Sequence, residues 1–126
     1  MMSAILERAM KQYREKVEAS GILSVEVPQW PDENGKPTII YFRPMSSLPV
    51  KDYSKVVYYA TQGTVEAGVD ILITRALNAD KTPLFKQVER GELLRKVDPE
   101  VVLDIIGRMG ELDKTTQNTI EEAEKN

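Results

Sequence analysis

The amino-acid sequence predicts a mostly α-helical α+β fold, with an N-terminal helix, one β-hairpin and then a bundle of three to four short helices. Two patterns lead to this prediction. Apolar residues recur every three or four positions in several segments, and a β-branched and aromatic segment follows an Asn-Gly dipeptide. The chain of 126 residues has the length of one domain and contains no internal repeat.

Residues 2–19 are predicted to form an amphipathic helix that ends near Gly21. Charged residues occupy one side of this helix, and we expect them to face solvent; the alternative is that they bind a partner. The other side carries the residues at helical spacing: Met2, Ile5, Leu6, Ala9, Met10, Tyr13 and Val17.

Residues 22–43 are predicted to form the β-hairpin. Its turn contains Asn34 and Gly35, which both tolerate positive φ angles, and its second arm is β-branched and aromatic over residues 38–43. Pro28 and Pro31 interrupt the first arm, because proline cannot donate a ladder hydrogen bond. We therefore expect the first arm to be a short strand or an edge strand, with Trp30 in a loop.

Helices are predicted over residues 50–61, 64–77, 89–96 and 99–109, after a connector at residues 44–49. Residues 69–74 are rich in β-branched types and could also form a buried strand. The helical spacing continues through residues 75–77, so a helix is favoured. Asp98 and Pro99 make a good start for the last helix, and Gly110 is expected to end it.

The last part of the chain differs in character from the rest. Residues 113–126 contain Ile120 as their single strongly apolar residue, too little to fold by burial. We expect a globular domain over residues 1–112 and a polar tail over residues 113–126, either a frayed helix or disordered.

The sequence contains no histidine and no cysteine. Zinc sites built from these residues, disulfides and imidazole-based nucleophile systems are therefore excluded. The 20 acidic residues are numerous enough for chance neighbours, and each aspartate considered has an ordinary role as a helix cap or solvated charge: Asp52, Asp70, Asp80, Asp98 and Asp104. We predict no enzymatic activity, no catalytic residue, no metal and no cofactor.

Charge and hydropathy further limit the partners. The net charge is −3, and basic residues form neither a cluster nor an alternation with aromatic residues, so nucleic-acid binding is not predicted. No apolar segment approaches the roughly 20 residues of a membrane helix. The N-terminal segment also lacks the apolar centre of a signal peptide. We expect a soluble, non-exported protein that works by binding.

Three segments, in this order, resemble the tail assembly chaperone family of long-tailed phages. Residues 25–30 (VEVPQW) and 40–46 (IYFRPMS) resemble the family's early hairpin, and residues 73–85, which end in DKTPLF, resemble the segment after its central helices. Residues 89–109, with a Leu-Leu pair and a capped helix, resemble its C-terminal arrangement. The sequence differs from the family pattern in the missing glycine before Leu84 and in the long hairpin loop at residues 31–37.

The resemblance implies a small non-enzymatic protein of the host cytoplasm that is absent from the mature virion. Such proteins bind the helical, aggregation-prone tape measure protein, keep it soluble and help to recruit tail tube subunits. In many relatives a ribosomal frameshift adds a domain that contacts the tail tube protein, and the polar tail here would suit a linker to it. Weak homo-oligomers are also compatible with such a role.

Five residues are candidates for partner binding: Trp30, Tyr41, Arg43, Leu84 and Phe85. Leu84 and Phe85 are more often core anchors that hold a loop in place, because large apolar residues are usually buried. Trp30 is as consistent with a binding contact as with packing. For Arg43 a surface ion pair is expected more than a client contact.

Two other functions stay open at this point. The first is a virion structural protein, such as a tail completion or connector subunit. The second is a small magnesium- or carboxylate-dependent enzyme, for which the acidic composition is the sole argument.

Overall fold

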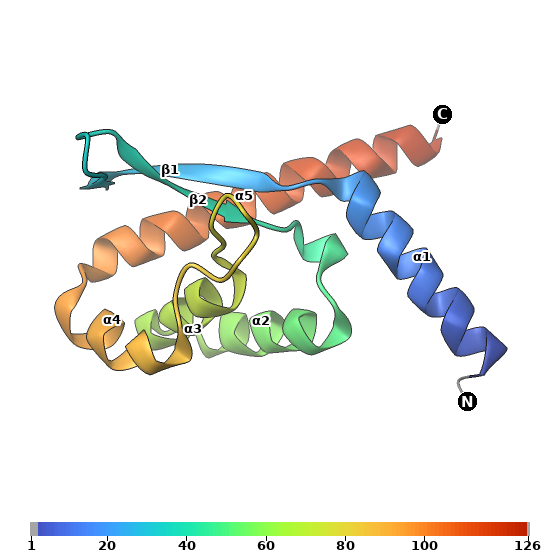
Figure 1. Cartoon of the computed structure of the whole chain (residues 1–126), viewed down its shortest axis with the longest axis horizontal. Coiled ribbons are helices and arrows are strands. Elements are labelled where there is room, and N and C mark those ends of the chain that lie inside the picture. The colour runs from blue at the N-terminus through green and yellow to red at the C-terminus, as the bar shows by residue number, and fades with distance from the viewer. Residues whose placement is uncertain (1–2, 126) are drawn as a thin grey trace.

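The computed structural model describes residues 3–125, with side chains described as far as Thr115. Figure 1 shows the elements, which confirm the predicted fold class. In chain order they are α1 (Ala4–Ser20), β1 (Leu23–Pro31), β2 (Pro37–Phe42), the 3₁₀ turn η1 (Met45–Ser47), α2 (Val50–Gln62), α3 (Val65–Arg75), the 3₁₀ turn η2 (Gln87–Glu89), α4 (Arg90–Lys96) and α5 (Pro99–Lys125).

The hydrophobic core lies where the β-hairpin packs against α3 and α5. Strands β1 and β2 pair antiparallel, with Val25 opposite Ile40. Because side chains alternate along a strand, one side of the hairpin collects its apolar residues and faces the helices. The buried residues of this cluster are Val25, Val27, Ile40, Phe42, Leu72, Ala76, Val101, Ile105 and Met109.

Strand β1 is longer than the sequence suggested, since it continues through both prolines. The register shifts between Val27 and Pro31, so Pro28 lies at an irregular, unpaired position. Both strands of a two-stranded sheet are edges, so the prediction of an edge strand is confirmed and that of a short strand is wrong. Gly35 has φ 78°, as its turn position requires. The Asp32 carboxylate, whose role the sequence did not indicate, accepts the N–H groups of residues 34 and 36.

The helices α2, α3 and α4 agree with the predicted segments within a few residues, and residues 69–74 are helical as favoured. Helix α3 ends at Arg75, before the predicted end at Leu77. The cause is a short β-bridge, in which the Leu77 N–H donates to the Tyr41 carbonyl at 2.7 Å and the Leu77 carbonyl accepts the Tyr41 N–H at 3.1 Å. Leu77 therefore extends the edge of the hairpin.

The last helix does not end at Gly110. The α5 backbone continues to Lys125. A glycine typically ends a helix by adopting a left-handed conformation, whereas Gly110 keeps the helical conformation. Asp113, which the sequence placed in a polar tail, forms an ion pair with Arg75 and belongs to the packed part of the molecule. The side chains after Thr115, including that of Ile120, lie outside the described residues.

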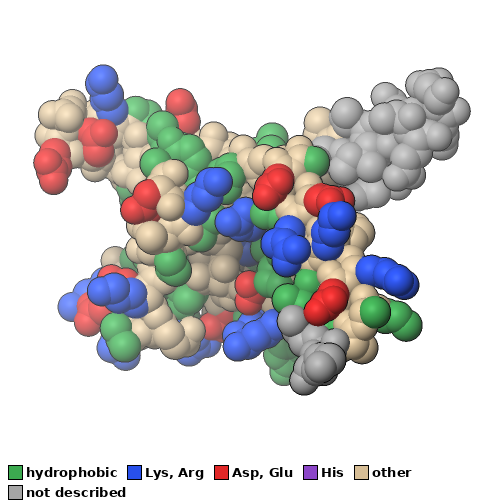
Figure 2. Space-filling model, turned by 45° about the vertical axis from the view of Figure 1, so that its right-hand side comes forward, with side chains coloured by type: hydrophobic (Ala, Val, Ile, Leu, Met, Phe, Trp, Pro, Cys, Tyr) green, Lys and Arg blue, Asp and Glu red, His purple; other side chains and the backbone are tan. Residues whose placement is uncertain are grey.

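Helix α1 begins at an N-cap, Ser3, whose hydroxyl accepts the Leu6 N–H. It projects from the rest of the molecule (Figure 1) and contains no buried residue. Its main tether is the Tyr13 hydroxyl, which donates to the Ser47 carbonyl at 2.7 Å. The charged residues of α1 are exposed as predicted, and on the side shown in Figure 2 basic and acidic side chains are interspersed. Among residues 3–125, no helix has the length and apolar character that crossing a membrane requires.

Candidate functional site

An apolar groove of about 410 Å³ lies between α2 and α5, with α3 beneath it. We call it the α2–α5 groove. Its two charged residues, Arg75 and Asp113, neutralise each other, so its walls suit apolar side chains rather than a polar substrate. The lining residues are Met45, Val56, Val57, Ala60, Thr61, Ile71, Arg75, Ile106, Met109, Gly110 and Asp113.

Helix α2 forms an exposed wall of this groove. The three- and four-residue spacing of Tyr53, Val56, Val57 and Ala60 places them on one side of the helix, and among them Val56 alone is buried. Tyr53 remains 47% exposed and Val57 43% exposed. Large apolar side chains left in contact with water over several turns are typical of a surface that binds another molecule.

The apolar surface continues from the groove toward α1. Met45 lines both the α2–α5 groove and a second hollow of about 440 Å³, in which Val50 and Tyr53 lie beside the polar residues Lys16, Ser46 and Ser54. Val50, Tyr53 and Val57 follow one another at three- and four-residue spacing, so they form a stripe along one side of α2. We call these three residues the α2 stripe. Groove and stripe together offer an apolar surface as long as α2 itself.

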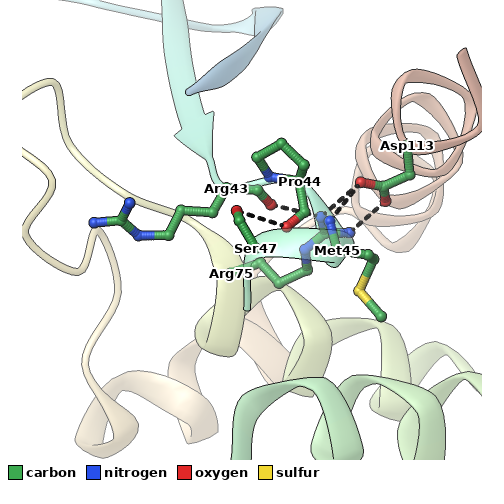
Figure 3. A network of polar contacts seen from close by, with 6 residues as sticks. All are labelled: Arg43, Pro44, Met45, Ser47, Arg75 and Asp113. Carbon is green, nitrogen blue, oxygen red and sulfur yellow. Dashed lines mark hydrogen bonds and ion pairs between the residues drawn. The ribbon is translucent and has the colours of Figure 1, made fainter. Parts of the chain in front are cut away.

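A buried polar network fixes the floor of the groove (Figure 3). The Arg75 guanidinium, on α3, donates to the Asp113 carboxylate at 2.7 and 2.9 Å and to the Arg43 carbonyl at 2.8 Å. Asp113 also accepts the Met45 N–H at 3.1 Å. One ion pair thus connects α3, α5 and the connector before α2, and it positions Met45 at the junction of the two hollows.

Two glycines on α5 have open space around them. A Cβ atom added at Gly107 or Gly110 would meet nothing within 4 Å. Glycine inside a helix costs about 1 kcal/mol relative to alanine, and the described part of the chain gives no steric reason for either residue. Gly110 lines the groove, so its missing side chain leaves the α5 backbone accessible to an approaching molecule.

A third hollow, of about 420 Å³, separates α1 from α2 and α3. Its walls carry Arg14, Arg43, Glu18 and Asp52, so charges of both signs are present. Burial raises the pKa of Tyr13 there, and the nearby Arg43 charge acts in the opposite direction. This mixture of charges favours neither an anion nor a cation as ligand.

The five residues predicted for partner binding are all half-buried. Trp30, Leu84 and Phe85 pack against the core cluster, and Trp30 lies in β1 rather than in the expected loop. Tyr41 belongs to β2, where its backbone pairs with Leu77. The Arg43 side chain points away from the Asp113 network (Figure 3) and lines the hollow beside α1.

None of these five residues lines the α2–α5 groove among its described residues. Among the described side chains, Arg43 takes part in no ion pair, so the surface ion pair expected for it is wrong. Of the residues that line the groove, Val56, Val57 and Ala60 were visible in the sequence as part of one apolar side of the helix predicted over residues 50–61. Gly110, which also lines the groove, was interpreted as a helix end.

Comparisons with protein-family models, curated proteins and solved structures found no match to this chain. Within the described part of the chain, no three His, Cys, Asp or Glu side chains form a group that could hold a metal ion. The groove and the α2 stripe are therefore the candidate functional site on geometry alone.

Proposed function

We propose that this protein is a non-enzymatic chaperone that binds an amphipathic helix of a client protein, as tail assembly chaperones of long-tailed phages do. The observation that carries the proposal is the mostly apolar α2–α5 groove, whose two opposite charges are paired, continued by the exposed α2 stripe. Both are surfaces for apolar side chains, and they adjoin each other.

The dimensions of this surface match a helical client. Residues 50–60 of α2 extend over about 15 Å at the helical rise per residue. A helix lying along this length would present apolar side chains at positions i, i+3 or i+4 and i+7, which is the usual mode of helix recognition in an apolar groove. The open backbone at Gly110 allows such a helix to lie close to α5.

The identity of the client comes from the family resemblance of residues 25–30, 40–46, 73–85 and 89–109. It points to the tape measure protein, a long helical protein that aggregates without a partner. In this proposal the chaperone acts in the host cytoplasm, holds the tape measure protein soluble while tail tube subunits assemble around it, and is absent from the mature virion.

Co-expression with the tape measure protein encoded beside this gene tests the proposal. The wild-type protein should raise the soluble fraction of the client and co-purify with it, and Val57→Asp should abolish both effects. Val88→Asp is the matched control, because Val88 is 87% exposed on η2 and lies outside the groove. A client that stays insoluble with the wild-type protein, or equal capture by Val57→Asp, would contradict the proposal.

Mass spectrometry of purified virions supplies an independent result. We expect the protein to be absent from them. Its presence at a fixed copy number would favour the virion structural protein instead.

A further inference from the structure

Helix α1 has an apolar side that its own chain leaves uncovered. Leu6 is 46% exposed and Met10 is 40% exposed. Both lie on the same side of α1 as Tyr13, because the spacing of these three residues follows the helical repeat. Tyr13 faces the connector before α2, where its hydroxyl donates to the Ser47 carbonyl. Leu6 and Met10 therefore project from the side of α1 that faces the start of α2.

Helices α1 and α2 meet at a corner. Figure 1 shows α1 descending from the hairpin past the N-terminal end of α2. Lys16 of α1 and Val50 of α2 line the same hollow of about 440 Å³ at this place. We call this hollow, together with Leu6 and Met10, the α1–α2 corner. Since Met45 lines both this hollow and the α2–α5 groove, the corner continues the groove toward the end of α2.

Both helices of the corner carry net positive charge. Helix α1 contains four basic and three acidic residues, and α2 contains two basic and one acidic, so each carries +1. Glu18 and Asp52 line the separate hollow of mixed charge. Among the described side chains, no ion pair involves Lys16, Lys51 or Lys55. The corner therefore combines apolar contacts with positive charge that its own chain does not neutralise.

We propose that the α1–α2 corner binds one end of the client helix and selects a helix with acidic side chains beside its apolar side. This inference rests on the proposed function, because the client is the helix assigned above to the α2–α5 groove. A helix that lies along α2 and continues past Val50 enters the corner, where Leu6 and Met10 contact its apolar side.

The charge of the corner determines which helices it accepts. Carboxylates that flank the apolar side of the client come close to Lys16, whereas lysines at the same positions would meet a like charge. Complementary charge of this kind gives specificity and faster association more than raw affinity. Helix α1 thus forms a second wall of the client site, which accounts for its exposed apolar residues.

Binding of two synthetic peptides to the full chain tests the proposal. Each has about 20 residues, long enough to be partly helical in water, and both carry leucine and alanine at the same helical spacing. One has glutamate at all flanking positions and the other has lysine, two residues of similar helix propensity. In fluorescence anisotropy at low ionic strength, the glutamate peptide should bind about tenfold more tightly. This preference should decrease in about 0.5 M salt.

Three variants test whether α1 belongs to the site. Leu6→Gln removes an apolar contact and should weaken binding of the glutamate peptide by about tenfold. Lys16→Gln should weaken it by about threefold and reduce its salt dependence. Lys11→Gln is the matched control for both, because it introduces the same residue on another side of α1, where Lys11 is 71% exposed. It should bind like the wild type, and circular dichroism of each variant checks that the helices persist.

Three results would overturn the inference. The first is equal affinity for the two peptides, and the second is no binding of either peptide. The third is a Leu6→Gln or Lys16→Gln variant that binds the glutamate peptide as tightly as Lys11→Gln does.

Co-expression with the tape measure protein separates this inference from the proposed function. If the wild type and Leu6→Gln solubilise the client equally, the inference alone fails. If the glutamate peptide binds as described but the wild type leaves the client insoluble, the proposed function alone fails, and the corner then serves an acidic helix of another protein.

Discussion

Asp113→Ala is the substitution that most directly tests how α5 is held in the fold. The aspartate makes two hydrogen bonds to Arg75, at 2.7 and 2.9 Å, and accepts the Met45 N–H at 3.1 Å. The Arg75 side chain is 4% exposed, so its guanidinium would stay buried without its counter-charge. Removing one partner of a buried ion pair costs about 3–5 kcal/mol.

We expect a loss at the lower end of that range, about 3 kcal/mol, because the Asp113 side chain is 16% exposed and its removal admits some water. Urea unfolding followed by circular dichroism measures the loss. With a slope m of about 1.5 kcal/mol/M for a domain of this size, the midpoint should fall by roughly 2 M. The slope itself should not change.

Glu111→Ala is the matched control, since it also removes one carboxylate from α5 but at a site 76% exposed. Its effect should stay below about 0.5 kcal/mol. The double variant Arg75→Met/Asp113→Ala leaves no buried charge unpaired and should recover at least half of the loss. Equal losses in the free energy of unfolding for Asp113→Ala and Glu111→Ala would refute the reasoning. Asp113 would then belong to a polar tail, as the sequence predicted.

Four further substitutions have definite expected outcomes. Gly110→Ala should raise the free energy of unfolding by about 1 kcal/mol, because the added Cβ meets nothing, whereas Gly63→Ala should lower it, since Gly63 has φ 65°; thermal unfolding measures both. Tyr13→Phe should cost about 1 kcal/mol at neutral pH. Burial raises the pKa of Tyr13, so the folded state holds the proton more tightly, and the difference from wild type should disappear as the pH rises through that pKa. Trp30→Ala should cost about 2 kcal/mol in urea unfolding, because Trp30 packs on the core; an unchanged midpoint would assign it to partner binding instead.

The elements that the sequence predicted well are those with local causes. Residues 50–61 became α2, Val50–Gln62, because its apolar spacing is regular and Gly63 adopts the left-handed conformation that ends a helix. Thr64 caps α3 by accepting the Ala67 N–H, and Asp98 accepts the Glu100 N–H at the start of α5. Each of these signals acts within four residues, so no tertiary contact is needed to recognise it.

The features that could not be predicted depend on contacts between distant segments. Asp113 reads as part of a polar tail until Arg75, which is 38 positions away, is placed beside it. Leu77 leaves the helical pattern because Tyr41 offers a free strand edge. Glycine is common at helix ends, which is why Gly110 was expected to end the last helix. The continuation of α5 shows instead that Gly110 lies inside the helix and beside the groove.

The same physical limit applies to the candidate site. Spacing shows which side of a helix avoids water, but it does not show whether the covering surface belongs to the same chain or to another molecule. Val56 and Val57 are neighbours in one apolar side and both line the groove, yet Val56 is buried by its own chain whereas Val57 is 43% exposed. The apolar side of α1 has the same ambiguity, since it is encoded as clearly as a core-facing side and is covered by nothing in the described chain. The solvent exposure of an apolar side in the folded chain therefore distinguishes a binding surface from a core. In this protein α1 and α2 both have an exposed apolar side.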